Sequence, residues 1–259
     1  MEAIAWQKQN ESQVGAQEAP LDPLMKEMIE AGVLYGHKKS RTNPRFKPFI
    51  HATRNGMEII DIAKTEEAIK SAAAFLREIL KKGGMVLVVA TQPAAAHAGR
   101  AFAETVRGAF VNDKWIGGLL TNFQIVSERI SYFKRLKSEL ASGALEKYTK
   151  KERGEIAEML EKMQKRFAGI TEMTSLPSAL LIVDTSIKGH ATALREAKKI
   201  GVPVIGIIDS DDDPTQLAVA IPGNDHSLKS VGWIFDYLQK EIGDITPASP
   251  ALAEGQNIV

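Results

Sequence analysis

The chain has 259 residues, 44% hydrophobic and 25% charged, so it can bury a full core in one large domain or in a domain with an insertion. Its formal net charge of +1 excludes a uniformly basic coat for nucleic acid, so any such contact must come from locally concentrated charge. The lack of cysteine excludes disulfides, thiolate metal sites and a cysteine nucleophile, and no apolar run approaches the roughly 20 residues of a membrane helix. We therefore expect a soluble, unsecreted protein of a reducing compartment, by default the cytoplasm.

The two ends of the chain differ in composition from its middle. Residues 1–20 are rich in Gln, Glu, Ala and Asn, and residues 246–259 repeat Pro, Ala and Ser. Segments of this kind cannot offset their ordering entropy by burial. We expect a disordered tail at each end.

Strand and helix patterns alternate along most of the chain between the tails. Short runs rich in Val and Ile predict buried strands at residues 85–90, 109–111, 179–184 and 202–209. Helical patterns separate them, at residues 65–82, 93–107, 188–200 and 225–242. Parallel strands need crossover connections, so this alternation predicts an α/β domain with a doubly wound parallel sheet, built from residues 21–120 and 171–245.

Residues 121–170 break the alternation, because they contain two helical stripes and no strand-like run. The first stripe consists of Phe123, Val126, Ile130, Phe133, Leu136 and Leu140. The second consists of Ile156, Met159, Leu160, Met163, Phe167 and Ile170. Thr121 with Gln124, and Thr149 with Glu152, match the spacing of a capping box. The segment predicts an antiparallel helical hairpin inserted into the α/β domain.

The densest charge anomaly is the segment 36–54, GHKKSRTNPRFKPFIHATR, here called the strap, with six positive residues and no acidic one. Phe46 and Phe49 can anchor an extended segment or stack on bases while cations reach phosphates. Because arginine can clasp a phosphate with two parallel donors, we expect Arg41 and Arg45 to matter more individually than the lysines. The alternative is a solvated loop with snorkelling lysines. The expected RNA contacts of the strap are His37, Lys38, Lys39, Arg41, Asn43, Arg45, Lys47 and Arg54.

Two further segments offer basic groups. In residues 114–122, KWIGGLLTN, paired glycines would let backbone amides approach a phosphate, which makes Lys114 and Trp115 candidates; the alternative is a tight turn over a packed Trp115. The hairpin has more basic than acidic residues, and a solvated coiled coil explains them as well as an RNA-binding arm does. Its expected RNA contacts are Lys134, Arg135, Lys150 and Lys151.

Carboxylates gather where two predicted strands end. Asp184 follows one strand, and Asp209, Asp211, Asp212 and Asp213 follow the next. Such groups can hold Mg²⁺ for phosphoryl transfer, but no phosphate-cradling motif or activated nucleophile accompanies them. We interpret them as helix-starting charges and turn caps. His190 and His226 lack a partner at ligand spacing and are interpreted as surface or interface histidines. We therefore expect no catalytic residue, no metal ligand and no cofactor.

Five blocks, in order between residues 24 and 244, closely resemble the bacterial-type family of the second protein of the small ribosomal subunit. They are GVLYGHKKSRTNPRFKPFI, RNGMEIIDIAKT, KWIGGLLTNF, VDTSIKGHATALREAKKIGVPVIGIIDS and IPGNDHSLKSV. The resemblance implies a flavodoxin-like parallel sheet with a protruding helical hairpin. Residues 210–212 and His226 depart from the usual family pattern, so no ion site is carried over.

The same resemblance implies what the protein does. A family member is a structural constituent of the ribosome, not an enzyme, and supports translation in the cytoplasm. Its partners are folded small-subunit ribosomal RNA and neighbouring ribosomal proteins, which in bacteria include the large multidomain first protein of the subunit, and no membrane. Two other classes stay open on the residues alone. One is a Mg²⁺-dependent phosphoryl-transfer enzyme that uses Asp184 and the cluster from Asp209 to Asp213, because open α/β sheets bind ligands at strand ends. The other is a nonribosomal interaction module.

Overall fold

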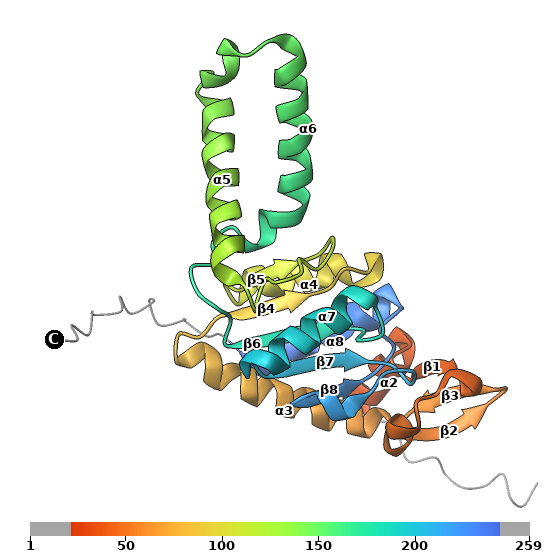
Figure 1. Ribbon diagram of the computed structural model, residues 1–259. Coiled ribbons are helices and arrows are strands. Elements are labelled where there is room, and N and C mark those ends of the chain that lie inside the picture. The colour runs from red at the N-terminus through yellow and green to blue at the C-terminus, as the bar shows by residue number, and fades with distance from the viewer. Residues whose placement is uncertain (1–21, 244–259) are drawn as a thin grey trace, which may run out of the picture.

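A five-stranded parallel sheet forms the centre of the computed structural model, which describes residues 22–243 apart from the side chains of residues 146 and 147 (Figure 1). The two predicted tails, residues 1–20 and 246–259, lie outside the described residues. Along the sheet the strand order is β5-β4-β6-β7-β8, and every neighbouring pair is parallel. The strands are β4 (Val86–Val89), β5 (Ala109–Val111), β6 (Ala179–Val183), β7 (Val204–Ile208) and β8 (Val219–Pro222). This order is that of flavodoxin-like sheets, so the predicted fold class is confirmed.

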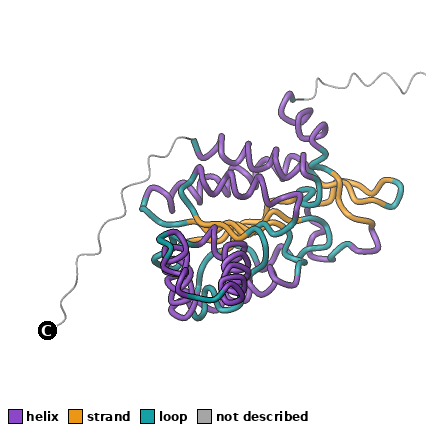
Figure 2. Tube along the Cα trace, turned by 90° about the horizontal axis from the view of Figure 1, so that it is seen from above, coloured by secondary structure: helices purple, strands orange, loops and turns teal. Residues whose placement is uncertain are grey.

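Helices cover both faces of this sheet, as the view along its layers shows (Figure 2). One face packs against α2 (Pro23–Ala31), α3 (Ile62–Lys81), α4 (Pro93–Thr105) and α8 (Leu228–Ile242). The other face packs against α7 (Lys188–Ile200) and the base of the hairpin. None of the helices between residues 22 and 243 is both long and apolar enough to span a bilayer.

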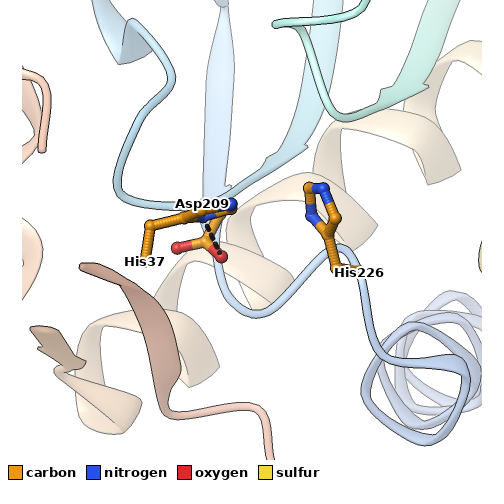
Figure 3. Close-up of side chains that lie close together, drawn as sticks. All are labelled: His37, Asp209 and His226. Carbon is orange, nitrogen blue, oxygen red and sulfur yellow. Dashed lines mark hydrogen bonds and ion pairs between the residues drawn. The ribbon is translucent and has the colours of Figure 1, made fainter. Parts of the chain in front are cut away.

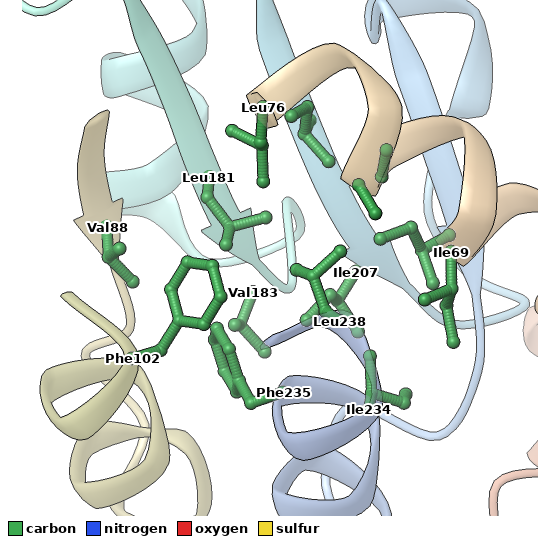
Figure 4. Close-up of a cluster of buried hydrophobic side chains, with 14 of the residues drawn as sticks. Ile69, Leu76, Val88, Phe102, Leu181, Val183, Ile207, Ile234, Phe235 and Leu238 are labelled. Carbon is green, nitrogen blue, oxygen red and sulfur yellow. The ribbon is translucent and has the colours of Figure 1, made fainter. Parts of the chain in front are cut away.

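The strands read as unbroken apolar runs because both of their faces are buried. Along β4, Val88 points into the core shared with α4 and α8, while Val89 belongs to the opposite core. Figure 4 shows the first of these cores, where Phe102 and Phe235 meet with ring centroids 5.3 Å apart. Burying each such ring contributes about 1.5–3 kcal/mol, so the two cores stabilise the packing of the sheet against its helices.

The hairpin projects from the sheet next to β5 (Figure 1). It consists of α5 (Phe123–Ala141), a 3₁₀ turn (Ala144–Lys147), α6 (Lys150–Phe167) and a second 3₁₀ turn (Ala168–Ile170). The capping box predicted at Thr149 and Glu152 is confirmed. The one predicted at Thr121 is wrong: α5 starts one residue later than expected, after Asn122, and Thr121 instead bonds to a glutamate of α7.

The two apolar stripes pack on each other only in part. Phe133 and Phe167 meet across the hairpin with ring centroids 6.2 Å apart. Near the base, however, Val126 and Ile170 belong to the same buried cluster as Leu87 of β4. The base of the hairpin is therefore continuous with one of the two cores of the α/β body.

The strap belongs to a small antiparallel sheet that the sequence reading did not predict. Its order is β1-β3-β2, with β1 (Tyr35–Lys38), β2 (Ile50–Arg54) and β3 (Met57–Ile60). Between β1 and β2 the chain forms two 3₁₀ turns, Lys39–Arg41 and Pro44–Phe49, so the expectation of an extended strap is wrong. Asn55 and Gly56 both adopt positive φ, as the two-residue turn of a tight hairpin requires. Phe46 is fully buried against Ile60 and Ile208, so it anchors the strap.

Candidate nucleic-acid interface

The strap lies over the loop that follows β7, residues 209–213, here called the acidic loop. Nη2 of Arg41 lies 3.1 Å from an Asp211 carboxylate oxygen, and Nη1 of Arg45 lies 2.5 Å from one of Asp213. The backbone amide of Asn43 donates to the Ser210 carbonyl at 2.8 Å. The basic strap and the acidic cluster, which the sequence reading treated as separate features, therefore form one paired unit.

His37 links the strap to the same loop (Figure 3). Its Nδ1 lies 3.0 Å from an Asp209 carboxylate oxygen and 3.4 Å from one of Asp211. Its backbone amide donates to the Ser210 hydroxyl at 2.8 Å. The hydrogen bond to Asp209 raises the pKa of the imidazole above its usual value. With its side chain 15% exposed, His37 acts mainly as a clamp on the loop.

His226 closes the cluster from the start of α8. Its ring meets that of His37 edge-on with centroids 4.9 Å apart, and its Nδ1 is hydrogen-bonded to Asp225. This bond raises the pKa of His226 to about 9, and burial raises the pKa of Asp225 well above its usual value. The second Asp225 oxygen is buried and has no partner among the described residues.

These side chains come within ligand distance of one another in two groups. The sets His37, Asp209, His226 and Asp184, Asp225, His226 each place their ligand atoms within 4.8 Å of one another, and either could hold a divalent cation. The sequence-based conclusion that His226 lacks a partner at ligand spacing is wrong. Its partners lie in distant parts of the chain, so no local spacing motif could reveal them.

The remaining aspartates of the loop have different tasks. Asp213 caps the 3₁₀ turn Pro214–Gln216 by accepting from the Thr215 amide at 3.0 Å, as the capping interpretation predicts. Partial burial opposes ionisation there, but the hydrogen bonds from Thr215, Gln216 and Arg45 outweigh it and lower its pKa to about 2. Asp212 accepts from the Thr185 hydroxyl, and burial raises its pKa to about 6. Asp209 accepts from the Ser210 amide, as a turn cap does, and also binds His37. Within the described residues Asp211 binds only His37 and Arg41 of the strap, so for Asp211 the capping interpretation is wrong.

At the point between β4 and β6, where open sheets of this order bind ligands, the protein's own side chains are hydrogen-bonded to one another. Gln92, after β4, donates to the carboxylate of Asp184, after β6. His190 is fully buried, with its ring nitrogens 2.9 Å from the Thr91 hydroxyl and 2.6 Å from the Asp184 carbonyl. Burial lowers the pKa of His190, so its ring is neutral and structural, and its interpretation as a surface or interface residue is wrong.

The loop at residues 114–122 is organised around a buried carboxylate. Glu196 of α7 accepts from the Trp115 indole at 3.1 Å and from the backbone amides of Gly118 at 2.8 Å and Leu120 at 3.1 Å. The amides that could have met a phosphate are thus directed at this glutamate. Trp115 is 6% exposed and its indole is bonded to Glu196, as the packed-turn alternative predicts, so little of its ring is left for a base. No sequence signal singled out Glu196, because it is one charged residue in an ordinary amphipathic helix.

The lysines and arginines that the sequence proposed as RNA contacts outside the acidic loop's reach fall into two groups, those without a partner and those with one. Lys38, Lys39, Lys47 and Arg54 of the strap and Lys114, Lys150 and Lys151 elsewhere have no hydrogen bond or ion pair from their side chains to any other described residue. The other hairpin candidates are partnered: Lys134 lies 3.2 Å from Glu172, and Arg135 lies 3.8 Å from Glu139. Asn43 caps a 3₁₀ turn by accepting from the Arg45 amide. The sequence-predicted residues therefore do not converge on one cleft.

This arrangement defines an α/β protein with a projecting helical arm, in which exposed cations of the strap and the hairpin are candidate binding groups. The model of the family "Ribosomal protein S2" matches residues 28–244. The chain belongs to this family.

Individual relatives agree with the family match. The small ribosomal subunit protein uS2 of Thermus thermophilus is 37% identical over 238 residues, which cover 90% of this chain and 92% of the relative. That of Coprothermobacter proteolyticus is 42% identical over 207 residues, covering 80% of this chain and 76% of the relative. That of Geotalea uraniireducens is 40% identical over 207 residues, covering 80% of each chain.

Proposed function

We propose that this chain is a structural component of the small ribosomal subunit that binds folded small-subunit ribosomal RNA. The observation that carries this proposal is family membership across nearly the whole described chain. Ribosomal protein S2 is a structural family, so the phosphoryl-transfer alternative is set aside.

The exposed cations of two separated regions are the proposed RNA contacts. Lysine and arginine bind RNA by neutralising phosphates and releasing condensed counterions. The strap offers Lys38, Lys39, Lys47 and Arg54, and the far end of the hairpin offers Lys150 and Lys151, at the start of α6. The two regions lie at different edges of the molecule (Figure 1), so a folded RNA could be held at two places at once.

Other ribosomal proteins are the second class of proposed partner, with the cytoplasmic ribosome as the location. The large multidomain first protein of the subunit is one such partner, and it remains a proposal that rests on the family resemblance.

Sedimentation of the tagged full-length chain through a sucrose gradient tests this function. We expect the chain to migrate with the small subunit at low salt and to be released as salt is raised. The variant Glu155→Gln, which changes an exposed glutamate of α6, serves as a control that should sediment like the wild type. A chain that stays at the top of the gradient while other small-subunit proteins sediment would refute the proposal.

A further inference from the structure

The register of the small antiparallel sheet brings two strap cations together with the turn between β2 and β3. Lys38 of β1 and Arg54 of β2 are both register partners of Met57 on the central strand β3. Directly paired residues of antiparallel strands point to the same face, so the two cations flank Met57 two strand spacings apart, about 10 Å. The backbone amide of Lys39 donates to the Gly56 carbonyl at 2.9 Å, which ties a third cation to the same turn. We call Lys38, Lys39 and Arg54 the sheet tip.

No carboxylate neutralises the sheet tip within residues 22–243. All three side chains are exposed, and none is paired with another described residue. Glu58, the acidic residue that follows Met57, is 3% exposed. It points to the opposite face of the sheet from Met57, because side chains alternate along a strand. Its carboxylate accepts from the hydroxyls of Thr53 and Thr42. The positive charge of the tip is therefore fully available to solvent.

The two arginines of the strap, unlike the sheet tip, are paired with carboxylates. Arg41 and Arg45 are each 62% exposed, but their partners Asp211 and Asp213 are only 11% and 17% exposed. A phosphate that approached either guanidinium would come close to a carboxylate fixed by the fold, and like charges at such distances repel. The acidic loop thus already engages one Nη of each guanidinium and fixes a negative charge beside it.

We propose that the sheet tip binds phosphates of the RNA backbone, whereas Arg41 and Arg45 are positioning residues that hold the strap on the acidic loop. This inference rests on the proposed RNA-binding function and assigns the contact within it. It reverses the expectation from residue type alone, by which the two arginines would be the strongest phosphate ligands. Lys38 and Arg54, about 10 Å apart, would each take a separate phosphate.

Two double variants that lose the same charge separate these roles. The full-length chain and the variants Lys38→Gln/Arg54→Gln and Arg41→Gln/Arg45→Gln are titrated with a transcript of the small-subunit ribosomal RNA at several salt concentrations. Each variant loses two positive charges, so a difference between them reports position and not net charge. For the tip variant, Lys38→Gln/Arg54→Gln, the slope of log affinity against log salt concentration should become shallower by about 1.4–1.8. Its affinity at 0.1 M salt should be roughly 30-fold lower than that of the wild type. We expect the arginine variant to keep the wild-type slope.

A third variant, Lys38→Arg/Arg54→Lys, exchanges the two side chains and keeps both charges. Its salt slope should equal that of the wild type. A wild-type slope in the tip variant would overturn the proposal, as would a reduced slope in the arginine variant or failure of the exchanged variant to restore it. Circular dichroism of each variant shows that the fold persists. If the wild-type chain itself does not bind the transcript, it is the proposed function that fails, so the two failures are distinguishable.

Discussion

Replacing Glu196 by glutamine should destabilise the fold strongly, although the two side chains have nearly the same size. Glu196 is 8% exposed, and its carboxylate accepts from the Trp115 indole and from the backbone amides of Gly118, Leu120 and Thr121. A glutamine keeps one acceptor oxygen but turns an NH₂ group toward other donors, so at least one or two buried N–H groups lose their partner. Each such loss costs about 1–3 kcal/mol, which gives roughly 2–4 kcal/mol for Glu196→Gln.

Urea unfolding followed by circular dichroism and tryptophan fluorescence measures this loss. The midpoint should fall without a change in slope, since the surface exposed on unfolding stays the same. The melting temperature should drop by roughly 5–12 °C for a chain of this size. Glu155→Gln, the same change at an exposed position, should stay within about 0.5 kcal/mol of the wild type. If Glu196→Gln were equally mild, the loop at residues 114–122 would not depend on this carboxylate.

Three further changes test other parts of the structure. Burial raises the pKa of Asp212 to about 6, so ionisation of this side chain destabilises the fold as pH rises. In urea unfolding, the stability of the wild type relative to Asp212→Asn should therefore fall by roughly 2 kcal/mol between pH 4 and pH 7. A pH-independent difference would contradict this. Replacing residues 139–159 by a short Gly-Ser linker leaves the hairpin base in place, so we expect one cooperative thermal transition but weaker assembly into the subunit; a broadened or split transition would place the distal hairpin in the main core. Asp211→Asn removes the partner of Arg41, so the salt slope of RNA binding should steepen by about 0.7–0.9, whereas an unchanged slope would show that this guanidinium stays out of reach of RNA.

The α/β framework could be predicted because its signals are local. Helix α7 (Lys188–Ile200) and strand β5 (Ala109–Val111) have the predicted bounds, and the other strands of the sheet that were predicted differ by only a few residues. Strands buried on both faces show up as short apolar runs, and Gly201 with Pro203 marks the end of a helix. Strand β8 (Val219–Pro222) escaped prediction because it is an edge strand that is only partly buried.

The small antiparallel sheet could have been found from the sequence. Asn55-Gly56 is a strong hairpin signal, and it stands between two segments that pair as β2 and β3. The basic composition of the strap drew attention away from this turn. A local signal was therefore present, and only the pairing of β1 with β3 needed the tertiary structure.

The sequence by itself determined the alternating α/β framework, the helical insertion, the basic composition of the strap and the family. The tertiary structure decided which of the candidate groups are available for binding. His37 meets Asp209 across 172 positions of the chain, Arg41 meets Asp211 across 170, and Trp115 meets Glu196 across 81. Residue type sets the charge of a side chain, but its electrostatic environment depends on the neighbours that folding brings to it, and those neighbours come from distant segments packed at the ends of the strands.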